Sequence, residues 1–316
     1  MPLNPTVTIT DLVLDRDAFG LADWRAVVLR TAGEIGARNL SMMAAAIAFF
    51  AMLALFPGLA ATVSLYGYFA DPSDVGETLA LLRPLLPEGT YTLVDSRVTH
   101  LVTEARGELG VASLIGVALA SWSARAGVNA LVASLTAICR ERDTRNFIWG
   151  MAVSYGLTLM LILVTVVALA MLVVIPAGLT LAGVSMQPVV TALRWGVAFL
   201  AIAAGIAAVY RFGPSRRTPL PWVTAGSILS TILWVAMSAA FARYVGSFAN
   251  YNEVYGPLGA GVATLMWFYL TAFVVLLGAL LNAEIERYAI EIIARRRPDL
   301  LLRNDPLVRE MTGVGR

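Results

Sequence analysis

The chain has 316 residues, of which 59% are hydrophobic and only 14% are charged. Soluble domains carry charge on about a quarter of their residues, so this composition excludes an ordinary soluble domain and also a disordered chain. The 23 basic residues, all arginine, nearly balance 21 acidic ones, which argues against nucleic-acid binding through bulk charge. The remaining class is an integral membrane protein.

Six apolar segments are long enough to cross about 30 Å of hydrocarbon as helices. We therefore predict an all-α fold, a polytopic membrane bundle of six transmembrane helices. Seventeen arginines fall on one side of these segments and four on the other, so the positive-inside rule places both termini in the cytoplasm. The predicted spans are residues 41–70, 109–138, 147–175, 188–210, 221–248 and 257–283.

The regions outside the spans contain two further helical patterns. Residues 1–40 are predicted to be a cytoplasmic segment with a short amphipathic helix from Asp23 to Arg38. Residues 71–108 are predicted to be an outer loop, in which an apolar stripe from Val94 to Ala105 indicates a second short amphipathic helix. The transmembrane domain then takes residues 41–287, and an arginine-rich cytoplasmic tail takes residues 288–316.

Arg125 lies in the middle of the second span, about 20 Å from either end at about 1.5 Å per residue. A charge at that depth costs at least about 2.5 kcal/mol, so the side chain must face protein or water rather than lipid. Ser121 and Asn129 lie four residues before and after it, on the same helix face. This face is a candidate site for an anionic headgroup or substrate. The alternative is an arginine bonded to carbonyls or to a carboxylate of another helix.

Further polar candidates lie before and within the sixth span. Asn250, Asn252 and Glu253 are predicted to lie between spans five and six, and they are candidate substrate contacts unless they belong to a solvated outer loop. Asn282 is a fourth candidate. It continues a row of small and polar residues that includes Gly278, for which helix packing is the alternative role. The carboxylates available to pair with Arg125 are those of Glu253, Glu284 and Glu286.

Motifs for catalysis and metal binding are missing from the sequence. One histidine, His100, and one cysteine, Cys139, leave no zinc site built from these residue types and no internal disulfide. The chain contains no HExxH, GxSxG or Walker A motif. The sequence therefore predicts no catalytic residue, no metal and no cofactor, and a protein that is not an enzyme.

Three separated motifs occur in order along the chain. They are Ala44–Phe50 with Leu55-Phe56-Pro57, then Tyr210-Arg211-Phe212-Gly213-Pro214, then Phe248–Gly256 followed by Leu277–Glu284. In this order they resemble the YihY/BrkB family of bacterial inner-membrane proteins, over about residues 39–287. The resemblance implies six helices and an inner-membrane location. Members of that family have been linked to serum resistance, to envelope lipid transport and, by the name ribonuclease BN, to tRNA processing.

These observations lead to three functional hypotheses. The first is a transporter or transport-associated permease for an amphipathic or anionic envelope molecule such as a lipid, bound at the Arg125 face. The second is a non-transporting membrane scaffold for envelope assembly. The third is a membrane-associated ribonuclease, for which the sequence offers no chemistry. The predicted partners are membrane lipids, with envelope proteins or a second copy of the chain as further candidates, and no nucleic acid.

Overall fold

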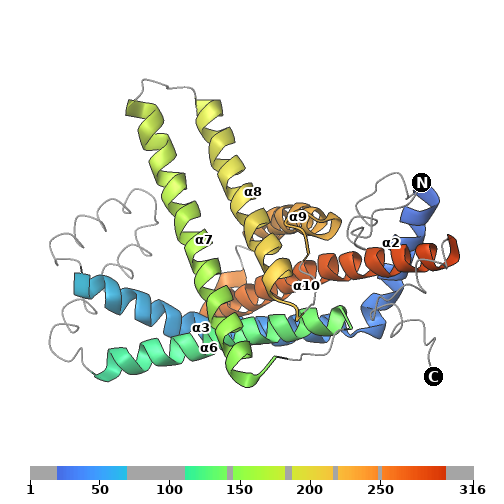
Figure 1. Cartoon of the computed structure of the whole chain (residues 1–316). Coiled ribbons are helices and arrows are strands. Elements are labelled where there is room, and N and C mark those ends of the chain that lie inside the picture. The colour runs from blue at the N-terminus through green and yellow to red at the C-terminus, as the bar shows by residue number, and fades with distance from the viewer. Residues whose placement is uncertain are drawn as a thin grey trace.

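The structure, a computed structural model, describes residues 20–69, 111–140, 145–181, 187–215, 220–247 and 251–296. Regular structure in these ranges is entirely α-helical, which confirms the all-α part of the predicted fold (Figure 1). The predicted outer loop 71–108 and most of the tail 288–316 lie outside the described residues. The helices are α2 (Leu21–Ala37), α3 (Leu40–Phe69), α6 (Val111–Ile138), α7 (Phe147–Leu181), α8 (Gln187–Phe212), α9 (Ala225–Ser247) and α10 (Tyr251–Arg296).

In the described part of the chain, fewer helices qualify as membrane spans than the six predicted. Within the described residues, α7, α8, α9 and α10 are long and apolar enough to cross a bilayer, and α2 with α3 makes a fifth if the two form one bent span. The second predicted span coincides with α6, which is not among them. The part of α6 whose side chains are described, residues 118–138 apart from 120, carries Arg125 and Asn129, and these lower its hydropathy. Several apolar helical spans are therefore confirmed, whereas the number six is not.

A sharp bend separates α2 from α3. Asn39, between the two helices, has a φ of 52°, a left-handed conformation that asparagine adopts more readily than most residues. The helix axis turns by 64° between Leu21–Ala37 and Leu40–Leu55. The amphipathic helix predicted from Asp23 to Arg38 is therefore an element of its own, and it lies beside the C-terminal part of α10 (Figure 1).

The long helices form two groups. α3 packs extensively against α6, and α10 packs against both α3 and α9. α7 and α8 pair with each other and lean away from α3 and α6 (Figure 1). α10 is longer than the span predicted at 257–283, since it begins at Tyr251 and continues without a break to Arg296.

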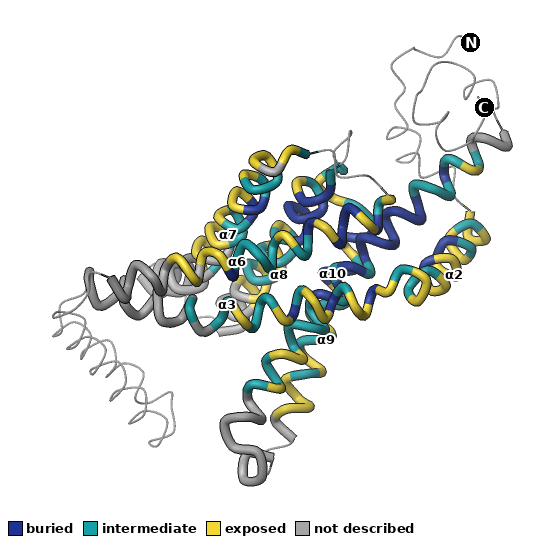
Figure 2. The backbone as a smooth tube through the Cα atoms, turned by 90° about the horizontal axis from the view of Figure 1, so that it is seen from below, coloured by how far each residue is buried: buried dark blue, intermediate teal, exposed yellow. Residues whose placement is uncertain are grey.

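The buried core is concentrated at one end of the helices (Figure 2). Leu40 at the start of α3 and Ile138 at the end of α6 are fully buried there, beside Tyr210 near the end of α8 and Leu280 on α10. Farther from this end the helices expose large apolar side chains, such as Leu159 of α7 at 66%. Exposed apolar surface of this kind is expected where helices face lipid, because lipid tails are as apolar as leucine.

Two glycines set the close approach of α9 to α10. A Cβ atom added to Gly226 would overlap the carbonyl oxygen of Gly278 and lie 2.6 Å from the side chain of Asn282. A Cβ added to Gly278 would overlap the carbonyl oxygen of Gly226 and the Ser230 hydroxyl, and would lie 2.6 Å from the Tyr210 hydroxyl. Small residues at such crossings let helix backbones come close enough for polar contacts between them. We call this contact the α9–α10 seam.

Hydrogen bonds across the α9–α10 seam link three helices. The Ser230 hydroxyl on α9 donates to the Val274 carbonyl of α10 at 2.9 Å. The Tyr210 hydroxyl on α8 lies 2.8 Å from the Ser230 hydroxyl and donates to the Val275 carbonyl at 2.5 Å. Buried hydroxyls are thus paired with buried carbonyls, as a low-dielectric interior requires.

Candidate functional site

Arg125 is half-buried on α6 and faces α7. Its guanidinium carbon lies 5.8 Å from the ring centre of Tyr155 on α7. Its Nε atom is buried and has no hydrogen-bond partner among the described residues. Ser121 and Asn129, one turn before and after, are both exposed. The polar face predicted from the spacing is therefore present on α6, and it lies at the surface of the α3–α6 pair rather than in the packed core.

The described carboxylates do not pair with Arg125. The Glu284 carboxylate instead accepts a hydrogen bond from the Arg287 guanidinium, one turn later on the same helix. Glu253 lies in the first turn of α10, and its side chain is outside the described part of the structure. Within the described residues, the contact that the structure gives the Arg125 guanidinium is the Tyr155 ring, which attracts the cation weakly.

The asparagines predicted around span six have different settings. Asn250 lies outside the described residues. Asn252, like Glu253, belongs to α10 rather than to a loop, because the helix begins at Tyr251. An acidic residue in the first turn of a helix is stabilised by the helix dipole, which is consistent with this early start. The backbone at these two positions is therefore helical, where a loop was predicted. The side chains of both residues are outside the described part of the structure.

Asn282 belongs to the α9–α10 seam. Its side chain is 7% exposed. Its Oδ1 accepts a hydrogen bond from the Gly226 N–H at 2.8 Å, and its Nδ2 donates to the Thr224 hydroxyl at 2.9 Å. These bonds fix the start of α9 against α10. The polar atoms of the Asn282 side chain therefore bind Gly226 and Thr224 rather than Arg125. Helix packing accounts for this side chain, the alternative that the sequence left open.

An ionic cluster at the end of α6 was not found by sequence reasoning. Arg38 donates to the carbonyls of Ala137 and Ile138 at 3.2 and 3.0 Å, and Arg287 donates to the Ile138 carbonyl at 3.1 Å. The last carbonyls of a helix lack partners within the helix and carry its negative dipole end, so arginines bind there favourably. We call these residues, with Glu34, Arg140 and Glu284, the α6-end cluster.

Glu34 connects α2 to this cluster. Its carboxylate accepts a hydrogen bond from Arg38 Nε at 2.7 Å and lies 3.5 Å from Arg140 Nη2. The hydrogen bond from Arg38 lowers the pKa of Glu34 below its usual value, and the nearby positive charges act in the same direction while burial opposes them. The arginines involved are ones that the sequence indicated only as a positive-inside signal. Their convergence on the Ile138 carbonyl depends on residues 100 and 149 positions apart in the chain.

Glu34→Gln is expected to destabilise the folded chain at pH 7 but not in acid. A carboxyl group whose pKa is lowered on folding stabilises the native state above its unfolded pKa, about 4.5 here, and this contribution is lost as the pH falls through the folded pKa. Thermal unfolding of the two proteins in detergent should therefore differ at pH 7 and converge in acid. Glu291→Gln is the control, because its exposed pair with Arg30 should contribute little at any pH. A gap between wild type and Glu34→Gln that persists in acid would contradict the role of the ionised carboxylate.

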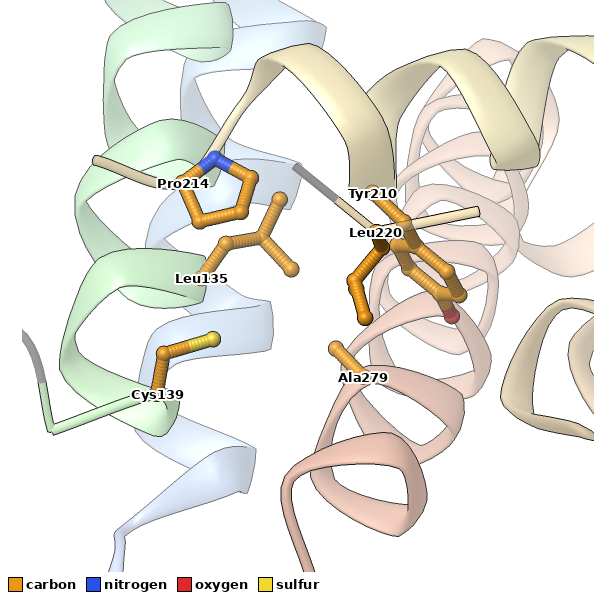
Figure 3. A pocket seen from close by; sticks show the side chains of 6 residues that line it. All are labelled: Leu135, Cys139, Tyr210, Pro214, Leu220 and Ala279. Carbon is orange, nitrogen blue, oxygen red and sulfur yellow. The ribbon is translucent and has the colours of Figure 1, made fainter. Parts of the chain in front are cut away.

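A small apolar recess lies at the same end as the core. Figure 3 shows its lining, which comes from the ends of α6 and α8, the segment before α9, and α10. Its volume of about 10 Å³ leaves room for about one water molecule, which is too little for a substrate. The lining residues are Leu135, Cys139, Tyr210, Pro214, Leu220 and Ala279.

Comparison with protein families gives a match over most of the chain. The family model described as "Virulence factor BrkB" matches residues 31–299. The chain belongs to the BrkB family. The resemblance that its separated motifs indicated is therefore confirmed.

Curated relatives of this BrkB-family chain are known from several bacteria. YfkH of Bacillus subtilis (strain 168), which is named ribonuclease-like, is 31% identical over 249 residues, covering 77% of this chain and 89% of YfkH. A UPF0761 membrane protein of Rhodospirillum rubrum is 27% identical over 256 residues, covering 79% of this chain and 56% of the relative. A UPF0761 membrane protein of Kangiella koreensis is 23% identical over 263 residues, covering 82% of this chain and 63% of the relative. This chain thus spans little more than half of these UPF0761 proteins. No solved structure matches it.

The ribonuclease-like name of one relative raises the question of metal-dependent cleavage. Hydrolysis of RNA commonly uses clustered carboxylates that hold metal ions, or histidines as acid and base. In the described part of this BrkB-family chain, no group of three or more His, Cys, Asp or Glu side chains could hold a metal ion. The chain's one histidine, His100, lies outside the described residues.

Proposed function

We propose that this BrkB-family protein is an inner-membrane transporter, or a transport-associated permease, for an anionic amphiphile of the cell envelope such as a lipid. The observation that carries the proposal is the Arg125 guanidinium, which lies midway along α6 without a carboxylate partner in the described residues. A cation at that depth needs a polar neighbour, and an anionic headgroup supplies one. Two oxygens of a phosphate or carboxylate group can each accept a hydrogen bond from the planar guanidinium of an arginine.

The surroundings of Arg125 suit an amphiphile rather than a small hydrophilic anion. Trp122 on α6 is 61% exposed and Tyr155 on α7 is 37% exposed, so aromatic surface borders the polar face of Ser121, Arg125 and Asn129. The headgroup would bind the polar face, and its apolar part would lie on the aromatic side chains. Entry would be from the side of α7.

The proposed orientation has both termini in the cytoplasm. Arginines gather at one end of the helices, where the α6-end cluster forms and where Arg145 donates to the carbonyls of Gly213 and Pro214 at 3.0 and 2.9 Å. An excess of arginine at one membrane face is the property on which the positive-inside rule rests. The ends of α6 and α8 would then face the cytoplasm.

A non-transporting scaffold is the second candidate function. The α9–α10 seam favours it, because the polar side chains of Ser230 and Asn282 are fully engaged in packing. In that case an envelope protein or a second copy of the chain would cover the Arg125 face. We do not propose a nuclease, since the described residues offer no metal cluster for it.

Native mass spectrometry of the protein released from its own membrane tests the proposal. The wild type is expected to retain an anionic lipid or glycolipid that Arg125→Ala loses. Arg243→Ala is the matched control, because Arg243 is an exposed arginine on α9 and its removal should leave the bound lipid in place. Identical lipid profiles for the wild type and a folded Arg125→Ala protein would reject the headgroup role and favour the scaffold.

A further inference from the structure

Three of the four charged residues of α2, namely Asp23, Arg30 and Glu34, point toward the protein. Asp23 accepts a hydrogen bond from the Tyr288 hydroxyl of α10 at 2.7 Å. Arg30 forms an ion pair with Glu291 at 2.9 Å, and its guanidinium carbon lies 5.0 Å from the ring centre of Tyr288. Together with Glu34 in the α6-end cluster, Asp23 and Arg30 make up most of the charged residues of α2.

The outward side of α2 is apolar. Leu21 is 92% exposed, Leu29 is 61% exposed and Val28 is 56% exposed, and Trp24 beside them is 40% exposed. Among these apolar side chains Arg25 is the one outward-facing charged residue of the helix. A helix on a water-facing surface has the reverse arrangement, with charged residues outward and apolar residues against the protein. The environment outside α2 is therefore expected to be apolar.

α2 cannot rotate to bury this side, because its opposite side is anchored. Val27 is fully buried and packs with Leu281 and Ile285 of α10. The hydrogen bond from the Tyr288 hydroxyl to Asp23 holds the helix at the same side, where the exposed Arg30–Glu291 pair also lies. The apolar surface is thus a fixed feature of the folded chain rather than one position of a loose helix.

We propose that α2 is an in-plane membrane helix, whose outward side lies at the boundary between the headgroups and acyl chains of one leaflet. That leaflet is the cytoplasmic one in the orientation proposed above, but the inference does not depend on transport. The 64° bend at Asn39 inclines α2 strongly to α3, as an interfacial helix leading into a span requires. Arg25 would reach lipid phosphates with its guanidinium while its stem lies along the apolar side.

Lipid fits this surface better than a second protein because the surface continues onto α3. Met42, in the first turn of α3, is 73% exposed, and Phe49, two turns later, is 59% exposed. The apolar strip therefore passes from α2 through the bend onto a helix that enters the bilayer. A single lipid surface covers both parts, whereas a protein partner would have to follow the 64° turn.

Fluorescence quenching from a label on Val28 tests the assignment. The full-length Cys139→Ala protein would carry Val28→Cys labelled with an environment-sensitive fluorophore, in nanodiscs of phosphatidylethanolamine and phosphatidylglycerol. Leu159→Cys on α7 gives the reference for lipid contact, and Asn146→Cys, an exposed residue just before α7, gives the reference for water. Leu29→Cys is a second outward position, in case the first label perturbs the helix.

The expected result is that labels on Val28 and Leu29 behave like the label on Leu159. Nitroxide-bearing lipids should quench them to a similar extent, and aqueous iodide should quench them far less than the label on Asn146. Strong iodide quenching without lipid quenching would overturn the proposal and place α2 in water. Labels shielded from both quenchers would also overturn it, because a second copy of the chain would then cover this side.

Discussion

Gly226→Ala is expected to destabilise the folded chain by about 3 kcal/mol, the largest stability loss that we predict for a single methyl group. The new Cβ would meet the backbone carbonyl of Gly278, which cannot rotate away as a side chain could. It would also push against Asn282, whose Oδ1 accepts a hydrogen bond from the Gly226 N–H. The substitution therefore combines overpacking with distortion of a buried hydrogen bond.

Unfolding in detergent, followed by circular dichroism, measures this effect. Gly156→Ala on α7 is the matched control, because a Cβ at Gly156 has no neighbour within 4 Å. Alanine is the better helix former by about 1 kcal/mol, so the control should be unchanged or slightly stabilised. If Gly226→Ala proved as stable as Gly156→Ala, the two backbones could not approach as closely as the structure shows.

Arg125→Ala is expected to slow protein-dependent movement of a labelled anionic lipid across a bilayer by about tenfold or more. A charge-assisted hydrogen bond contributes about 1.5–3 kcal/mol, and about 1.4 kcal/mol corresponds to a factor of ten. The rate for Arg125→Lys should fall between those of the wild type and Arg125→Ala. Lysine keeps the positive charge but lacks the planar guanidinium that can bind two oxygens at once. The measurement is the rate at which the label becomes accessible to a membrane-impermeant quencher in proteoliposomes.

Two controls separate headgroup recognition from general damage. Arg243→Ala should move the labelled lipid at the wild-type rate, because this arginine is exposed on α9. A zwitterionic lipid should be moved more slowly than the anionic one by the wild type, and Arg125→Ala should affect it little. Equal slowing of both lipids by Arg125→Ala would mean that the substitution disturbs the fold rather than the binding of a headgroup.

Helix positions were the part of the structure that the sequence predicted best. The apolar run predicted at 147–175 is contained in α7 (Phe147–Leu181), and the amphipathic pattern from Asp23 to Arg38 nearly coincides with α2 (Leu21–Ala37). Both signals are local, since hydropathy and periodicity depend on neighbouring residues alone. Ends were less certain, and α10 runs past its predicted span on both sides because apolar content does not mark where a helix stops outside a membrane.

Long-range contacts could not be predicted in the same way. The sequence indicated that Gly278 and Asn282 lie on a small polar face, but not that Gly226 and Thr224 oppose them. The arginines of the α6-end cluster gave a topological signal, yet their target, the last carbonyls of α6, is identified only by the folded arrangement. Nor does any local pattern place Tyr155 beside Arg125.

The sequence pattern of α2 predicted an amphipathic helix but not which of its sides faces the protein. Its amphipathic sequence predicted a cytoplasmic helix, and an amphipathic helix in water would turn its charged side outward. The structure places Asp23 and Arg30 against α10 and leaves Leu21 and Val28 outside. The packing of Val27 on α10 and the hydrogen bond from Tyr288 to Asp23 determine which side of α2 faces the protein.

The central claim, that this BrkB-family chain moves an anionic amphiphile by way of Arg125, is tested most directly by flux in purified proteoliposomes. Wild-type protein is expected to move a labelled anionic lipid faster than protein-free liposomes do, and to lose most of that activity in Arg125→Ala while Arg243→Ala retains it. A folded wild-type protein whose flux equals that of protein-free liposomes for both anionic and zwitterionic lipids would contradict the claim and leave the scaffold as the better account.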